Sequence, residues 1–197
     1  HNQFTKDDGE TIYIPPTLLV SGFSIVEDIE QCVTMDAKQS GNKLFLVGQT
    51  ADNCGGSHAL QIQPSMACNT ALPEVDLTAG PANARAIHNA IKQGLVQSAH
   101  DLSEGGLLVA LAEMAFGGGL GITASQNELT DAMLVSETPS RYLIEVAPSD
   151  ADAFKELMDG ISCQEIGEVN DSNTLTVGNY TWNCDTLKSC WLEGMVI

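Results

Sequence analysis

Acidic, hydroxyl and glycine residues gather near the middle of the chain, in the stretch 100–120, HDLSEGGLLVALAEMAFGGGL. Asp101, Ser103 and Glu104 precede Gly105-Gly106, after which apolar residues recur at helical spacing. A glycine turn that opens a helix can hold an anion, because free backbone N–H groups and the helix dipole face it. A simpler interpretation stays open, in which Asp101 or Ser103 caps the helix and the glycines allow close packing.

A second polar cluster comes just before an alternating run that predicts a strand at 142–146. It contains Ser136, Glu137, Thr138, Ser140 and Arg141. A guanidinium can bind a carboxylate or a phosphate through two parallel hydrogen bonds, so this cluster is a second candidate for ligand binding. The alternative is a surface ion pair between Arg141 and Glu137, which would contribute little stability.

The elements that must position these clusters alternate between strands and helices. Strands are predicted at 18–24, 32–37, 43–47, 95–99, 120–122 and 142–146, and a closing hairpin at 163–169 and 174–177. Helices are predicted at 81–93, 107–116, 150–158 and 185–192, with polar connections at 48–57 and 126–133. The run 43–47 is strongly apolar and is expected at the centre of the sheet. Such alternation indicates an α/β or α+β fold.

The charge balance is acidic, with 8 basic and 26 acidic residues and a net charge of -18. Such a surface repels nucleic acid and anionic lipid, so neither is expected as a partner. No apolar run is long enough for a membrane span, and we expect no secretory leader, because the N-terminal residues show no charged-then-apolar pattern. A phosphate ligand would need helix N-termini, Mg²⁺ or another domain to offset this field.

The six cysteines form no C-x-x-C pair and no zinc spacing with histidine. We therefore expect reduced thiols, mostly buried, in a cytoplasmic protein. The chain begins at His1 rather than Met. We expect residues 1–16 to be a flexible lead-in or tag remnant and residues 17–197 to be a single domain of a longer protein.

The wording of these motifs resembles one family closely. H-D-x-S-x-G-G-L followed by A-L-A-E-M-A-F is similar to the C-terminal-type domain of formylglycinamidine ribonucleotide synthetases, within the aminoimidazole ribonucleotide synthetase-like superfamily. Further segments that resemble this family occur in its order: Thr17–Ser21, Val33–Asp36, Leu46–Gly48, Gly55–His58 and Ser136–Arg141. Other members of the superfamily have different residues at the central motif.

The resemblance implies a layered mixed β-sheet with packed helices. It implies a domain of the purine-biosynthesis ligase that converts formylglycinamide ribonucleotide to formylglycinamidine ribonucleotide, using ATP and ammonia released from glutamine. The whole enzyme would use ATP and Mg²⁺, and its partners would be the remaining domains, a glutaminase domain or subunit and a possible second copy. This segment alone would be inactive.

The resemblance places substrate-binding residues in both clusters and assigns no catalytic residue to this chain. The substrate-binding set is Asp101, Ser103, Gly105, Gly106, Ser136, Glu137, Thr138 and Arg141. No metal ligand is assigned. The alternatives are a non-catalytic acidic binding or scaffold module of the same fold and another superfamily enzyme, such as an aminoimidazole ribonucleotide synthetase.

Overall fold

The computed structural model describes residues 3–14, 18–126 and 129–194. The chain divides into two units, His1–Glu30 and Gln31–Ile197. In the first unit, β1 (Gln3–Thr5) pairs antiparallel with β2 (Thr11–Tyr13), and Gly9 at φ +86° lies in the turn between them. A short 3-10 helix, η1 (Ile29–Gln31), spans the boundary between the units.

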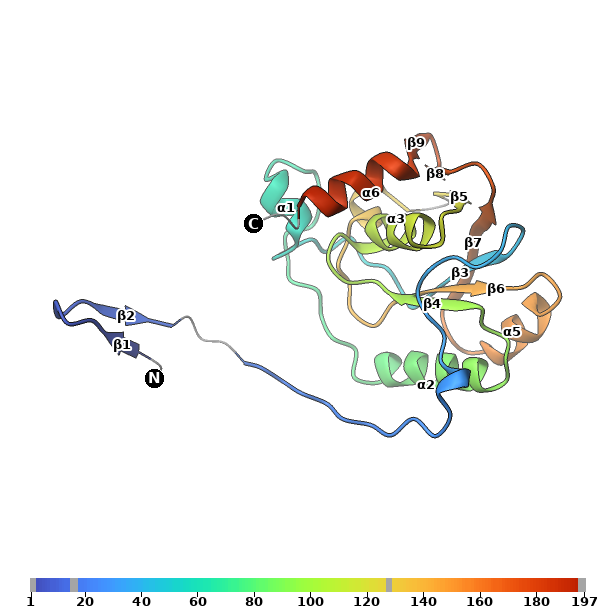
Figure 1. Ribbon diagram of the computed structural model, residues 1–197, viewed down its shortest axis with the longest axis horizontal. Coiled ribbons are helices and arrows are strands. Elements are labelled where there is room, and N and C mark those ends of the chain that lie inside the picture. The colour runs from blue at the N-terminus through green and yellow to red at the C-terminus, as the bar shows by residue number, and fades with distance from the viewer. Residues whose placement is uncertain (1–2, 15–17, 127–128, 195–197) are drawn as a thin grey trace. The chain divides into compact units, whose positions relative to one another are not determined.

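The second unit is built on a seven-stranded mixed sheet, in the order β4-β6-β3-β7-β5-β8-β9 (Figure 1). Its strands are β3 (Lys43–Val47), β4 (Ser98–Asp101), β5 (Gly121–Ala124), β6 (Tyr142–Val146), β7 (Cys163–Asn170), β8 (Thr174–Val177) and β9 (Tyr180–Asn183). All neighbouring pairs are antiparallel except β5 and β8, which run parallel.

Strand β3 separates two hydrophobic cores, because its alternate side chains point to opposite faces of the sheet. Leu44 and Leu46 lie in one core, and Phe45 and Val47 lie in the other. All four are buried, as expected for an apolar strand that is covered on both sides. The prediction that residues 43–47 form a central strand is confirmed.

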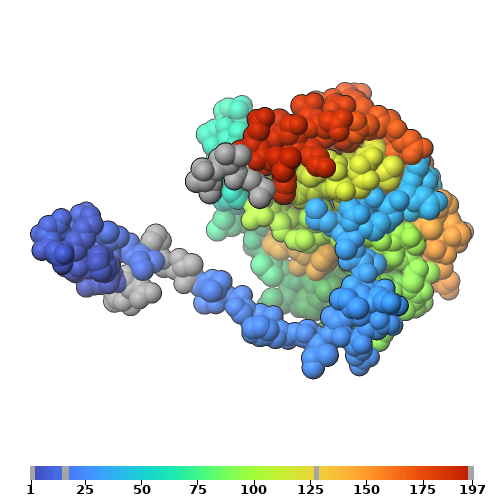
Figure 2. Space-filling view, in the orientation of Figure 1, coloured from blue at the N-terminus to red at the C-terminus, as the bar shows by residue number. Residues whose placement is uncertain are grey.

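Helices cover each face of this sheet (Figure 1). The Leu44 face carries α3 (Gly106–Gly118), α4 (Asp131–Leu134) and α6 (Cys184–Glu193). The Phe45 face carries α2 (Ala79–Lys92) and α5 (Ala151–Leu157). Helix α6 lies over α3 at the surface (Figure 2), where the rings of Phe116 and Trp191 are 5.8 Å apart. A short helix, α1 (His58–Ile62), follows the polar loop 48–57.

All four predicted helices are present, with ends within two residues of those expected, and α3 continues two residues beyond its predicted end, to Gly118. Its extension into the glycines occurs because Gly118 faces Ala37, where an added Cβ would lie 2.1 Å from the Ala37 carbonyl oxygen. Gly119 then ends the helix at φ +69°. Strand β4 begins three residues later than the predicted start at residue 95. Residues 127–128 of the predicted connection lie outside the described residues.

Two predicted strands, 18–24 and 32–37, are wrong. A strand needs a neighbour for its N–H and C=O groups, and no described strand pairs with residues 18–24. In the segment 32–37, backbone groups make irregular contacts instead. The Ala37 N–H donates to the Met114 carbonyl at 3.0 Å, and the Thr34 carbonyl accepts from the Ala99 N–H at 3.2 Å.

The predicted closing hairpin is also wrong, although both of its strands exist. Strand β5 lies between β7 and β8 in the sheet, antiparallel to the first and parallel to the second. Gly167 makes this pairing possible, because an added Cβ would lie 2.2 Å from the Thr123 carbonyl oxygen. The domain boundary expected at residue 17 stays a prediction, and residues 1–2 and 15–17 lie outside the described residues.

Candidate functional site

The side chain of Arg141 is buried and shapes the turn that precedes it. Its Nε donates to the Thr138 carbonyl at 2.9 Å, its Nη1 donates to Thr50 Oγ1 at 3.0 Å, and its Nη2 donates to the Ser136 carbonyl. Burial lowers the pKa of Arg141 to about 10, which leaves the guanidinium charged at neutral pH. Across residues 3–14, 18–126 and 129–194, no carboxylate lies within ion-pair distance of it.

The surface ion pair between Arg141 and Glu137 is therefore not formed. The carboxylate of Glu137 accepts the backbone N–H of Gly105 at 3.0 Å and that of His58 at 3.0 Å, both on Oε1. His58 Nδ1 also lies 3.6 Å from this oxygen. The first turns of α1 and α3 thus meet at one side-chain carboxylate.

The sequence predicts an anion site at the start of α3, and this arrangement shows which group occupies that position. An anion does lie against the Gly105 N–H, and it is the chain's own Glu137. Gly105 is the N-cap residue at φ +76° and has no side chain with which to cap the helix. The alternative in which Asp101 or Ser103 caps α3 is wrong, because Ser103 Oγ donates to Asp101 Oδ2 at 2.7 Å instead.

The two glycines of the turn are both required by close approach. An added Cβ on Gly106 would lie 2.2 Å from the Ser136 carbonyl oxygen, and one on Gly105 would lie 2.2 Å from a methyl carbon of Val109. Both glycines also have a positive φ, a backbone conformation that residues with a side chain rarely adopt. Close packing between the Asp101–Gly106 turn and the Ser136–Arg141 turn therefore brings the two predicted clusters together.

Four of the eight predicted substrate-binding residues line one cavity, which we name the Asp101 cavity. It has a volume of about 600 Å³, and its lining includes Asp101, Ser103, Glu104, Glu137 and Arg141. The side chain of Asp101 is 66% exposed. The hydrogen bond from Ser103 is the main reason why the pKa of Asp101 is lowered, and His100 adds to this effect.

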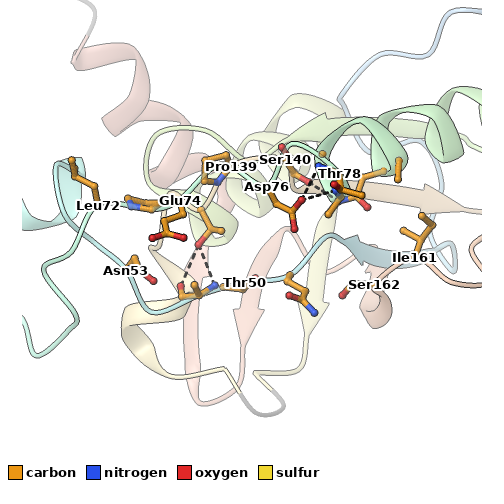
Figure 3. Close-up of a pocket in the computed structure, with 18 of the residues that line it drawn as sticks. Thr50, Asn53, Leu72, Glu74, Asp76, Thr78, Pro139, Ser140, Ile161 and Ser162 are labelled. Carbon is orange, nitrogen blue, oxygen red and sulfur yellow. Dashed lines mark hydrogen bonds between the residues drawn. The ribbon is translucent and has the colours of Figure 1, made fainter.

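A second cavity of about 710 Å³, which we name the Asp76 cavity, lies on the other side of the same turn (Figure 3). Pro139 and Ser140 line both cavities. Ser140 has φ +62°, and its carbonyl accepts from Asn83 Nδ2 at 3.0 Å. Gly80 leaves room for the Ser140 side chain, because an added Cβ would lie 2.6 Å from its Oγ.

The wall of the Asp76 cavity contains two carboxylates, Glu74 and Asp76, among hydroxyl, amide and apolar residues. Asp76 Oδ1 accepts the N–H groups of Thr78 and Ala79, each at 2.8 Å, at the start of α2 (Figure 3). These two bonds lower the pKa of Asp76. Of the predicted substrate-binding set, Thr138 lines this cavity, and the local signal at Asp76 was an acid two residues before the N-cap Thr78.

A buried carboxylate, Glu145, was missed by sequence reasoning. The alternating pattern of residues 142–146 predicts an ordinary strand, but this side chain is fully buried within it. Glu145 accepts from Asn42 Nδ2 at 2.7 Å and Ser98 Oγ at 2.6 Å, and from the backbone N–H groups of Lys38 and Gln39. It ties the segment before β3 to the edge strand β4.

The described residues do not by themselves fit ATP or Mg²⁺. Carboxylates line both cavities, and the three Arg141 donors named above point at a hydroxyl and two carbonyls of its own surroundings. Among the described residues, no cluster of three His, Cys, Asp or Glu side chains could hold a metal ion. None of the described helices is both long and apolar enough to cross a membrane.

The sequence matches a known family over residues 39–178, described as "AIR synthase related protein, C-terminal domain". The chain belongs to this family. The predicted fold, a layered mixed sheet with packed helices, is confirmed as that of the AIR synthase related C-terminal domain.

Solved structures share the fold at low sequence identity. PurL from T. maritima complexed with FGAR is 18% identical, with a TM-score of 0.71, and the match covers 81% of this chain and 30% of PurL. Phosphoribosylformylglycinamidine synthase II from Thermotoga maritima is 18% identical, with a TM-score of 0.68, and the match covers 81% of this chain and 28% of that chain. The hydrogenase maturation protein HypE in complex with ATP is 13% identical, with a TM-score of 0.55, and the match covers 76% of this chain and 50% of HypE. The chain thus spans about a third of the length of the PurL proteins that it matches.

Proposed function

We propose that this AIR synthase related C-terminal domain is part of a formylglycinamidine ribonucleotide synthetase. The observation that carries the proposal is the meeting of the Asp101–Gly106 and Ser136–Arg141 turns, joined by Glu137 on the rim of one cavity. Both turns belong to segments whose sequence resembles the synthetases. The greater likeness to T. maritima PurL than to HypE, with TM-scores of 0.71 and 0.55, supports the same choice.

In this proposal the domain holds the ribonucleotide substrate against the wall of the Asp101 cavity. Asp101, Ser103 and Glu137 can accept hydrogen bonds from sugar hydroxyls or an amide N–H. Gly105 and Gly106 keep the wall thin, and Ser136, Thr138 and Arg141 hold the turn in shape. All eight residues are substrate-binding or positioning candidates, and none is assigned a catalytic step.

The reaction of such a synthetase replaces an amide oxygen with ammonia. That oxygen is a poor leaving group, so ATP must phosphorylate it before ammonia attacks, and Mg²⁺ screens the phosphates. Because the described residues do not fit ATP or Mg²⁺, we assign both to the remaining domains of a longer protein. The acidic walls of this domain would help to direct the phosphates toward those domains.

The partners in this proposal are the remaining synthetase domains and a glutaminase domain or subunit that supplies ammonia. A second copy of the protein is a further candidate. The isolated chain is expected to form no amidine product when it is given formylglycinamide ribonucleotide, ATP, Mg²⁺ and ammonia. Product formed by the isolated chain would contradict the division of labour proposed here.

The deciding experiment uses the longer protein in which this domain occurs. We expect Ser103→Ala to raise the KM for formylglycinamide ribonucleotide while leaving the melting temperature unchanged. Thr181→Ala is the matched control and should change neither quantity, because this hydroxyl bonds Thr176 on the neighbouring strand and lines neither cavity. If the parent protein makes no formylglycinamidine ribonucleotide, the domain belongs instead to a non-catalytic binding module.

A further inference from the structure

Two loops beside the Asp76 cavity are packed together through their backbones. The residues 53–56 of one loop contact the residues 69–72 of the other, and Asn53 forms a parallel β-bridge with Asn69. The Cys54 N–H donates to the Asn69 carbonyl at 2.8 Å, and the Gly55 N–H donates to the Ala71 carbonyl at 3.1 Å. The position next to Cys54 must be glycine, because an added Cβ on Gly55 would lie 2.4 Å from the Thr70 carbonyl oxygen.

One cysteine from each side lies at this contact. Cys68 immediately precedes Asn69, whose carbonyl accepts from the Cys54 N–H, so the backbone contact brings the two cysteines close together. Cys54 is fully buried and its Sγ lies 3.6 Å from the Asp52 carbonyl oxygen and 3.7 Å from that of Ala132. Cys68 is only partly buried and free, so a small oxidant can reach it.

The thiol of Cys54 ionises less readily than an ordinary thiol. Burial, followed by the neighbouring Cys68, raises the pKa of Cys54 to about 11. A thiolate, rather than a thiol, attacks an oxidant, so Cys54 is a poor first nucleophile. The partly buried Cys68, which an oxidant can reach, therefore takes the first step, and the fully buried Cys54 takes the second.

We propose that Cys54 and Cys68 are a redox modification site, at which hydrogen peroxide converts the two thiols into a disulfide. The Cys68 thiolate attacks one peroxide oxygen, so that an S–O bond forms, the O–O bond breaks and hydroxide leaves. Cys54 gives its proton to that hydroxide and attacks the Cys68 sulfur. An S–S bond then forms, the S–O bond breaks, and the second hydroxide takes up the proton that Cys68 released. Two thiols are oxidised, and one peroxide is reduced to two waters.

This modification would fix two walls of the Asp76 cavity relative to each other. Asn53 and Ala71, which belong to the two packed loops, both line that cavity. The crosslink would close the segment 54–68, which includes the short helix α1 and so the His58 N–H that Glu137 accepts. The inference does not rest on the proposed synthetase function.

The experiment uses the full chain with Cys32→Ser, Cys163→Ser and Cys190→Ser, which leaves Cys54, Cys68 and the buried Cys184. The protein is treated with hydrogen peroxide, blocked with iodoacetamide in denaturant and digested with chymotrypsin without reductant. Trypsin is unsuitable, because no Lys or Arg lies between Lys43 and Arg85. Cleavage after Leu60 separates the two cysteines, so a disulfide between them is detected by mass spectrometry as two linked peptides.

We expect the linked peptides to appear after oxidation, to disappear with dithiothreitol, and to accompany a loss of two titratable thiols per chain. In the Cys54→Ser variant, Cys68 should instead be trapped as sulfenic acid by dimedone. In the Cys68→Ser variant, the thiol of Cys54 should remain unmodified.

Three results would overturn the proposal. The linked peptides could be missing after oxidation, or Cys184 could pair with either cysteine as often as they pair together. Cys68 could also proceed to sulfinic acid while Cys54 stays reduced, which would show that the buried thiol cannot reach it.

Discussion

Helices α2 and α3 cover opposite faces of one sheet, yet they are held in different ways. Along α2, only four residues are buried, and the rest of the helix is polar or partly exposed. Along α3, apolar residues occur all around the helix, and α6 covers part of the side that faces away from the sheet. A helix that is apolar on every side must be enclosed, so α3 carries more of the packing energy.

The starts of α2 and α3 also differ in where their capping carboxylate comes from. Helix α2 takes its carboxylate from Asp76, which is two residues before its N-cap. Helix α3 takes its carboxylate from Glu137, which comes from a turn 32 residues along the chain from Gly105. The local cap joins α2 to the residues just before it, whereas the remote cap joins α3 to the Ser136–Arg141 turn and the Asp101 cavity. The start of α3 therefore couples folding to the site, and the start of α2 does not.

The largest expected effect tests the packing of α3. Leu111 is fully buried at the middle of this helix. We expect Leu111→Ala to lower the free energy of unfolding by about 2–5 kcal/mol, through lost burial and the cavity left behind. Val109→Ala, at a residue of the same helix that is 37% exposed, is the control and should change it by less than about 0.5 kcal/mol. A denaturant midpoint that is equal for both variants would show that α3 is not enclosed.

The next effect concerns the contact between the two turns. Gly106→Ala introduces a Cβ at φ +62° that would lie 2.2 Å from the Ser136 carbonyl oxygen. Gly119→Ala has a similar φ of +69°, but nothing lies within 4 Å of the added Cβ. The control should cost about 1–2 kcal/mol for the left-handed backbone alone. Gly106→Ala should cost clearly more in the same unfolding experiment, and equal losses would mean that the turns are not in tight contact.

These glycines also show how much of the structure could be predicted from the sequence. The strand–turn–helix pattern at residues 95–118 follows from periodicity and from glycine chemistry, which are local properties. The polar clusters were recognised by residue type, and the structure brings them together. The pairing of Glu137 with Gly105 could not be predicted, because no local rule connects residues 32 positions apart.

Failures of prediction share that cause. Residues 18–24 have the composition of a strand, but composition does not provide a pairing partner. Glu145 occupies a polar position in an alternating run, and only the fold surrounds it with donors from residues 38–42 and from Ser98. The order of β5, β7 and β8 was likewise undetermined, since it depends on which strands meet in space.

A smaller effect separates the remote cap from the local one. Glu137→Ala leaves the N–H groups of Gly105 and His58 without their acceptor, and we expect a loss of about 1–2 kcal/mol in the free energy of unfolding. Asp76→Ala removes an exposed cap and should lower the melting temperature less. The measurement is paired thermal unfolding of both variants at neutral pH, and a larger loss for Asp76→Ala would reverse the comparison.

The pH dependence of the Asp76 cap follows from its lowered pKa. A carboxyl whose pKa is lower in the folded state stabilises the protein above its ordinary value, here 3.8. That contribution is lost as the pH falls from 3.8 through the lower folded value. The difference in melting temperature between the parent and Asp76→Ala should therefore shrink over this acidic range. A difference that stays constant down to the lowest pH at which the protein folds would show that the carboxylate charge does not support α2.

The smallest expected effect on folding is at Asp101, and it bears most directly on the site. Its side chain is 66% exposed, and it accepts from Ser103 rather than from the start of α3. Asn can accept the same bond, so Asp101→Asn should change the free energy of unfolding by less than about 0.5 kcal/mol. If the Asp101 carboxylate faces a ligand, its loss should nevertheless affect the longer protein. There we expect slower formation of formylglycinamidine ribonucleotide at an unchanged melting temperature. Unchanged turnover together with unchanged melting would remove Asp101 from the substrate-binding set, and the Asp101–Gly106 turn would then serve only to join α3 to the Ser136–Arg141 turn.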